Sequence, residues 1–218
     1  MNISSESSKI PKVRLAILIL AAGEGSRLGG YPKALLKKDG SSLLKRFIQS
    51  IQGFSPIETF IVTGFYSDAI ELEIESIQKS IKNAISWVRN PNPEAGQTSS
   101  VRLGIESLKS DYDVLVIALC DQPKVGAQEI KSLLEQFHQR AANEEIVLPM
   151  VGGQRGNPVL FSKEVIQRVL EIPGMVCRPY MDQHPELVKV FDTNNDAFVL
   201  DADTQDDIQK LGLKRIKP

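Results

Sequence analysis

An apolar run near the N-terminus, VRLAILILAA at Val13–Ala22, sets the strongest limit on the fold. Apart from Arg14 every residue in the run is apolar, and glycines follow directly. A strand can be apolar at consecutive positions when both faces of its sheet are covered, as in a parallel sheet. The glycines disfavour the alternative, a buried helix. The run therefore predicts a central strand with helices on both faces of its sheet.

Strand and helix patterns alternate through the next part of the chain. Short apolar runs predict strands over 56–64, 84–90 and 113–121. Amphipathic spacing and a serine cap predict a helix over 41–54, and further helices are predicted over 67–81, 98–110 and 126–142. This alternation is typical of right-handed βαβ units, which bind ligands at the carboxyl ends of their strands. We therefore expect the functional residues in the loops that follow strands.

The regular alternation of strand and helix patterns ends in the last third of the chain. Two apolar segments flank a glycine-rich turn within 144–161, and a helix is predicted over 162–171 and another at the end. We interpret this part as a hairpin-like extension over the sheet edge. No linker or repeat interrupts the sequence, so we expect one domain over 13–218, preceded by a flexible tail at 1–12.

Charge and cysteine content narrow the function classes. The formal net charge of −1 gives no broad attraction to nucleic acid or anionic lipid, so a small ligand is favoured. Cys120 and Cys177 have no C-x-x-C spacing, which argues against a zinc site or a disulfide framework. The polar N-terminus lacks a signal peptide's apolar run, and 13–22 is too short to span a bilayer. We expect a cytoplasmic protein.

The loop LAAGEGSRLGGYPKALL, Leu20–Leu36, has the composition of a phosphate site. Glycines let backbone amides approach an anion, and Arg27 and Lys33 add charged donors. The spacing fits neither a P-loop nor the dinucleotide fingerprint, because Lys33 lacks the preceding glycine and position 28 is leucine. A tight turn with solvated basic residues is the alternative. Fixed cations at a strand's carboxyl end favour phosphate binding.

Two acidic positions are candidates to face this loop. Asp121 ends an apolar strand in IALCDQP, where it could bind Mg²⁺ or cap the next turn. In VLDADTQDDI, Thr204 and Asp207 fit a helix capping box, which leaves Asp201 and Asp203 free to bind a metal. Asp203, next to the cap, is the better candidate. A carboxylate after a later parallel strand would face the same crevice as the glycine loop.

A third loop leads from a predicted strand into a helix that begins with Thr98, Ser99 and Ser100. Hydroxyl groups and free amides at a helix N-terminus can bind an anion or a nucleotide, although ordinary capping explains one hydroxyl of the three. His138 and His184 lie near no recognisable nucleophile elbow, so a hydrolase triad has no support. We expect both histidines to be non-catalytic.

Over nearly its whole length the chain resembles the MobA/MocA-like nucleotidyltransferases, in particular the molybdenum cofactor cytidylyltransferases. The glycine loop is similar to the family's L-A-A-G-x-S-x-R-M-G-x-x-K signature, with one residue inserted before the serine and with Leu28 where methionine is usual. Further similar segments are RNPNPEAGQTSSVRLGI (N-x-x-x-x-x-G-x-x-x-S-[LV]), CDQP, GQRGNPVLF with Asn157 in place of a histidine, and LDADTQDDI (D-I-D-T-P-E-D-L). The family's G-D-x-G-A-R segment is replaced here by PGMVCRPYMDQ, which leaves the acceptor's identity open.

The resemblance implies a Rossmann-like three-layer α/β/α nucleotidyltransferase fold with a mostly parallel sheet. It also implies bound NTP and Mg²⁺, with Asp121 and Asp203 on the metal and Arg27, Lys33 and Asp121 as catalytic residues. Ala21 and Ala22 favour CTP, because the guanylyl-transferring relatives carry L-A-G-G. The nucleotide-binding positions that follow are Leu20, Ala21, Ala22, Gly23, Gly25, Ser26, Lys33, Gly64, Asn90, Gly96, Ser99 and Ser100.

The implied reaction is transfer of CMP from CTP to a phosphorylated acceptor, molybdopterin or the molybdenum cofactor, with release of pyrophosphate. In-line displacement at the α-phosphorus depends on positioning and charge neutralisation, and it needs no side-chain nucleophile. A molybdoenzyme is the further partner implied. Two alternatives stay open: a sugar-1-phosphate nucleotidyltransferase, and a non-catalytic nucleotide- or cofactor-binding accessory protein for a molybdoenzyme.

Overall fold

The apolar run forms β1 (Leu15–Ala21), in which every residue is buried. The computed structural model describes residues 13–215, so the predicted tail at 1–12 lies outside the described residues. Strand β1 pairs in parallel with β4 (Glu58–Thr63) on one side and with β6 (Val114–Leu119) on the other. The prediction of a central strand is confirmed.

The sheet has eight strands in the order β10-β7-β9-β6-β1-β4-β5, with β8 paired to β7. Strands β8 and β9 pair antiparallel with their neighbours, and the other pairs in this sheet are parallel. The bounds of the remaining strands are β5 Ile85–Arg89, β7 Ile146–Val151, β8 Gln154–Arg155, β9 Val159–Ser162 and β10 Val188–Asp192.

The predicted position of the hairpin over the sheet edge is wrong. Strand β9 lies inside the sheet, between β6 and β7, and β10 forms the edge beyond them. All four residues of β9 are buried. Leu160 packs on one face of the sheet, whereas Val159 and Phe161 pack on the other. A strand with apolar side chains on both faces needs cover on both, and an interior position supplies it.

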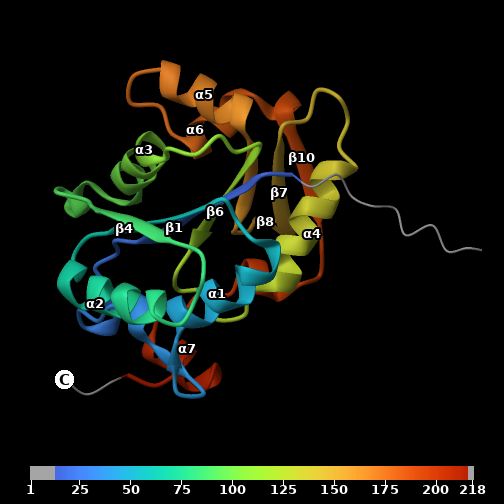
Figure 1. Ribbon diagram of the computed structural model, residues 1–218. Coiled ribbons are helices and arrows are strands. Elements are labelled where there is room, and N and C mark those ends of the chain that lie inside the picture. Colours follow the sequence, from blue (N-terminus) through green and yellow to red (C-terminus); the bar gives the residue numbers. More distant parts are fainter. Residues whose placement is uncertain (1–12, 216–218) are drawn as a thin grey trace, which may run out of the picture.

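Helices cover both faces of the sheet and make three layers (Figure 1). Leu15, Ile17 and Ile19 of β1 belong to one apolar core, and the alternate residues of the strand belong to the other. The predicted three-layer fold is confirmed. The first core packs under α1 (Leu43–Ile51), α2 (Ser67–Gln78) and α4 (Ala127–His138), and the second under α3 (Gln97–Ser107), α5 (Lys163–Glu171) and α6 (Cys177–Gln183).

A third, smaller core joins the two ends of the described chain. It packs Leu28 and Leu36, on either side of Lys33, against Ile208 of α7 (Gln205–Lys210) and Leu213. A two-stranded sheet, β2 (Lys37–Lys38) with β3 (Ser41–Ser42), lies beside it in the sequence. Short 3-10 helices span Ser26–Leu28, Lys33–Leu35, Gln52–Phe54, Pro93–Ala95, Pro185–Leu187 and Asp196–Phe198.

Strand register brings three loops to one edge of the sheet. Leu20 of β1 lies opposite Leu119 of β6, and Ala21 lies opposite Thr63 of β4. The residues after these strands therefore emerge side by side at the carboxyl edge, with β4 on one side of β1 and β6 on the other. Within residues 13–215, no helix has the length and apolar character needed to cross a membrane.

Gly64 allows the loops after β1 and β4 to touch. A Cβ atom added to Gly64 would lie 2.7 Å from the Ala22 carbonyl oxygen and 2.9 Å from the Ala22 Cα atom. Because backbone atoms at those distances must shift, a side chain at position 64 would push the glycine loop away from β4.

We expect Gly64→Ala to lower the free energy of unfolding by about 1–3 kcal/mol, the usual cost of forcing extra volume into a packed site. For a chain of this size each kcal/mol lowers the Tm by roughly 2–4 °C. Gly53→Ala is the matched control, because its Cβ would meet no atom of residues 13–215 within 4 Å. Equal melting temperatures for the two variants would contradict the close approach.

Candidate active site

A cleft of about 590 Å³ lies at the carboxyl edge of the sheet. Its walls come from the loops after β1, β4 and β6, from the start of α3, and from the segment before α7. Most of the positions implied by the resemblance line it: Leu20, Ala21, Ala22, Gly23, Gly25, Ser26, Arg27, Lys33, Gly96, Ser100, Asp121 and Asp203.

Residues 23–26 of the glycine loop line the cleft. Gly25 has a φ of 63°, and a Cβ on it would lie 2.2 Å from the Tyr31 carbonyl oxygen, so only glycine fits without rearrangement. The Gly25 carbonyl closes the turn by accepting from the amides of Leu28 (2.8 Å) and Gly30 (3.1 Å). Within residues 13–215, the amides at 23–26 donate to no carbonyl or side chain. Unpaired amides on a tight turn suit an anion.

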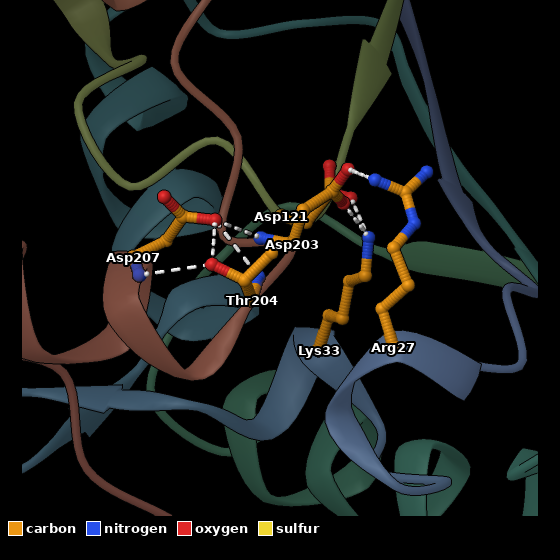
Figure 2. Close-up of polar contacts among 6 residues, drawn as sticks. All are labelled: Arg27, Lys33, Asp121, Asp203, Thr204 and Asp207. Carbon is orange, nitrogen blue, oxygen red and sulfur yellow. Dashed lines mark hydrogen bonds and ion pairs between the residues drawn. The ribbon is translucent and has the colours of Figure 1, made fainter.

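Two cations of the loop meet two carboxylates from distant parts of the chain, one after β6 and one before α7 (Figure 2). Lys33 Nζ lies 2.8 Å from Asp121 Oδ2 and is also hydrogen-bonded to Asp203 Oδ1. Arg27 donates to the other oxygen of Asp203, Oδ2, at 2.7 Å. The structure therefore joins the three predicted catalytic residues and both predicted metal ligands in one ionic cluster.

Lys33 is at the centre of this cluster. Its side chain is 20% exposed, and those of Asp121 and Asp203 are 17% and 28% exposed, whereas that of Arg27 is 72% exposed. Burial by itself would lower the pKa of Lys33, but the charges and hydrogen bonds of the two carboxylates more than offset it and raise the pKa. Lys33 is thus a firmly charged ammonium held between two carboxylates.

The carboxylates of Asp121 and Asp203 have the chemistry to hold a hard divalent cation. Asp121 Oδ1 is buried and accepts no hydrogen bond within residues 13–215. A buried acceptor of this kind is costly unless a cation or water satisfies it. In the same part of the chain no three His, Cys, Asp or Glu side chains converge as a complete metal site. Two carboxylates fit Mg²⁺, which usually takes its other ligands from phosphate and water.

Asp201, the other acidic candidate before α7, has a different environment. Burial, together with the neighbouring charges of Asp121 and Asp203, raises its pKa to about 6. Asp201 does not line the cleft, whereas Asp203 does. The geometry favours Asp203 as the partner of Asp121.

A capping box fixes Asp203 at the start of α7. Thr204 Oγ1 accepts from the Asp207 amide at 3.2 Å, and Asp207 Oδ2 accepts from the amides of Asp203 (3.2 Å) and Thr204 (2.8 Å). This confirms the predicted capping box. Because the box holds the amide of Asp203 itself, it orients that carboxylate toward Lys33.

Three predicted nucleotide-binding positions lie outside the cleft. Gly64 packs behind the glycine loop, and Asn90 and Ser99 hold the next loop together. The side-chain amide of Asn90 donates hydrogen bonds to the hydroxyls of Ser99 and Ser100, each at 2.9 Å. These three side chains therefore have partners within the protein. Of Thr98, Ser99 and Ser100 at the start of α3, Ser100 is the residue that lines the cleft.

Some other residues of the cleft were not identified from the sequence. Phe65, Glu94, Gln97 and Cys120 line it, and each adjoins a loop or position that was singled out. The available signal was their place beside a strand's carboxyl end or a helix start. His138 and His184 line neither this cleft nor the second cavity described next.

A second cavity of about 470 Å³ adjoins the cleft and shares Leu20, Gln97 and Leu119 with it. Side chains of β6, β7, β9 and α6 make most of its walls apolar. Arg155 and Asp182 form an ion pair of 2.6 Å at this cavity, and Arg178 also lines it. The segment that departs from the family pattern, at 173–183, thus forms part of this wall.

Comparison with known proteins places the chain in a family. The MobA-like NTP transferase domain matches residues 17–186, so the chain belongs to that family. The chain is 27% identical over 156 residues to a probable molybdenum cofactor guanylyltransferase of Bacillus cytotoxicus, covering 71% of this chain and 72% of that protein. The predicted family is confirmed.

Two further similarities define how far the likeness extends. The chain is 24% identical over 159 residues to the bifunctional protein GlmU of Prochlorococcus marinus, covering 72% of this chain but only 34% of the GlmU chain. It therefore spans about a third of that relative. The crystal structure of Rv0371c from Mycobacterium tuberculosis has the same fold, with a TM-score of 0.69 and 19% identity over 91% of this chain and 97% of that one.

We expect Thr204→Ala to lower the free energy of unfolding by about 0.5–2 kcal/mol, because α7 loses its N-cap. Urea unfolding measures the change. Thr204→Ser keeps the hydroxyl that accepts from the Asp207 amide, so its unfolding midpoint should stay near that of the wild type. An equal loss in both variants would show that the hydroxyl is not what stabilises this end of the site.

Proposed function

We propose that the chain is a Mg²⁺-dependent nucleotidyltransferase that transfers CMP from CTP to a phosphorylated acceptor and releases pyrophosphate. One observation carries the proposal: Lys33 and Arg27, on a loop of unpaired amides, meet Asp121 and Asp203 in a cleft beside the sheet. Cations and amides suit the phosphates, and the two carboxylates suit a hard metal ion.

The chemistry requires positioning and charge neutralisation. An acceptor phosphate oxygen attacks the α-phosphorus of the nucleotide, and the bond from that phosphorus to the bridging oxygen breaks, so pyrophosphate leaves with the electron pair. The attacking phosphate is already ionised, and the step therefore needs no general base. Arg27, Lys33 and the loop amides would stabilise the charge that builds on the leaving pyrophosphate.

Asp121 and Asp203 would hold the Mg²⁺ ion, which supplies charge neutralisation at the α-phosphate when it is bound. The unpaired Oδ1 atom of Asp121 supports this assignment. The capping box at Thr204 contributes by keeping the Asp203 carboxylate in place before any ligand arrives. These groups are preorganised, so little reorganisation is needed during the reaction.

We expect Lys33→Ala and Asp121→Ala each to lower the rate of transfer by at least about 10²-fold, the scale for removing one charge-stabilising group. The rate is measured as pyrophosphate release, and circular dichroism checks folding. Lys124→Ala is the matched control, because Lys124 makes a 2.8 Å ion pair with Asp196 away from the cleft. Near-normal turnover in either site variant would refute the assignment.

For the acceptor we propose molybdopterin or the molybdenum cofactor, whose nucleotide form would then pass to a molybdoenzyme. The adjoining cavity supports this choice, because apolar side chains of β6, β7 and β9 line it together with polar groups such as Asn157, and Arg178 brings a positive charge. Such a cavity can take a ring system that carries a phosphate.

A panel of nucleotides and acceptors tests the proposal and its two alternatives. Pyrophosphate release from CTP with molybdopterin, absent with either alone, is the expected result. Release with a sugar 1-phosphate instead would identify the sugar nucleotidyltransferase. Binding of CTP and molybdopterin without release, for every nucleotide tried, would identify a non-catalytic carrier and overturn the proposal.

CTP is proposed because Ala21 and Ala22 match the form associated with cytidylyl transfer. Ala22 is buried, and its Cβ packs against Gly64 at the wall of the cleft. We expect Ala22→Gly to open space there and raise the GTP-to-CTP ratio of kcat/KM by at least about tenfold, an amount comparable to one methyl group in a pocket. An unchanged ratio would show that position 22 does not select the base of the nucleotide.

A further inference from the structure

The two carboxylates of the ionic cluster are paired before any ligand binds. Asp121 and Asp203 contact the ammonium of Lys33, and Asp203 also contacts the guanidinium of Arg27. A divalent cation that arrives alone would therefore meet carboxylates that already have partners, with an ammonium between their oxygens. Like charges at contact distance repel strongly in a half-buried site.

The two cations of the cluster differ in position. Lys33 bonds both carboxylates and its side chain is 20% exposed, whereas Arg27 pairs with Asp203 and its side chain is 72% exposed. Lys33 is thus the group that stands where Asp121 and Asp203 would share a metal ion. Arg27 lies at the outer side of the cluster and leaves that space open.

The backbone at Lys33 is fixed, so any rearrangement belongs to its side chain. Pro32 precedes it with a φ of −66°, and a 3-10 helix begins at Lys33 itself. The neighbouring side chains of Ala34 and Leu36 are buried at 1% and 0% exposure. The long, flexible stem of a lysine can move its ammonium from the carboxylates to a phosphate in the same cleft without moving this backbone.

We propose that Lys33 is an exchangeable counter-ion: its ammonium holds Asp121 and Asp203 together in the free protein and leaves them for the triphosphate when a divalent cation is bound between them. The inference rests on the proposed function for the identity of the ligands. In this role Lys33 weakens the binding of a metal ion in the absence of nucleotide, because the triphosphate is the anion to which the ammonium can move.

Binding of Mn²⁺ alone, without nucleotide, tests this role. The full chain is titrated with Mn²⁺ and free metal is measured by electron paramagnetic resonance. We expect Lys33→Met to bind Mn²⁺ at least about tenfold more tightly than the wild type, because the variant leaves a net negative charge on the carboxylates. Lys124→Met, which breaks an ion pair outside the cleft, should match the wild type. Equal or weaker binding by Lys33→Met would overturn the proposal.

A second variant and a second measurement guard against a folding defect. Lys33→Gln should also bind Mn²⁺ more tightly, and Mn²⁺ should raise the Tm of both variants by more than it raises that of the wild type. Adding Asp203→Asn to Lys33→Met should abolish the gain. If neither Lys33 variant folds even with Mn²⁺, the proposal also fails, because the cation could not then take the ammonium's place.

These outcomes are independent of catalysis. Tighter Mn²⁺ binding by the Lys33 variants together with no transfer from any nucleotide would support the exchange and refute the proposed reaction. Transfer by the wild type with unchanged Mn²⁺ binding in the variants would support the reaction and refute the exchange.

Discussion

The parallel pairing of β1 with β4 and β6 determines where everything else in this molecule can lie. A strand that is buried on both faces and paired on both edges has no free surface along its length, so the residues at its ends are the ones that can contact solvent or a ligand. At the carboxyl end the register aligns three strands within a residue of one another. The glycine loop, the contact at Gly64 and the carboxylate of Asp121 are direct results of that alignment.

The ionic cluster then depends on support from outside the sheet. Asp203 approaches from the segment before α7, and its position relies on the capping box and on the small core that packs α7 under the glycine loop. Because buried charges are tolerated only when they are paired, the cations of the loop and the carboxylates stabilise one another's placement. The same pairing gives both carboxylates a counter-ion in the free site.

Much of this arrangement could be predicted from local patterns. The apolar run, the glycine loop and the capping box each depend on residues close in sequence, and the structure contains all three. The position of β9 could not be predicted, because a turn signal defines which strands form a hairpin but not which strand lies on the other side. Helix α6 was missed because it is short and contains Pro179, which is tolerated in a first turn.

The site was predicted less completely where side chains bond across loops. Asn90 and Ser99 have the polar groups expected of ligand contacts, yet they bond each other, and no local pattern distinguishes these two uses. Predicted helices also ran three or four residues beyond their observed ends, because amphipathic spacing continues after the last helical turn. Tertiary contacts decide both points.

The bond between Lys33 and Asp203 joins residues 170 positions apart, near opposite ends of the described chain. During synthesis, β1, β4 and β6 can pair while the segment that carries Asp203 has yet to be made. The loop that carries Lys33 is thus made before the segment that completes the carboxylate pair. A ligand that binds both parts would add its binding energy to the folding of the whole chain, and would hold the first strand's loop to the segment before the last helix.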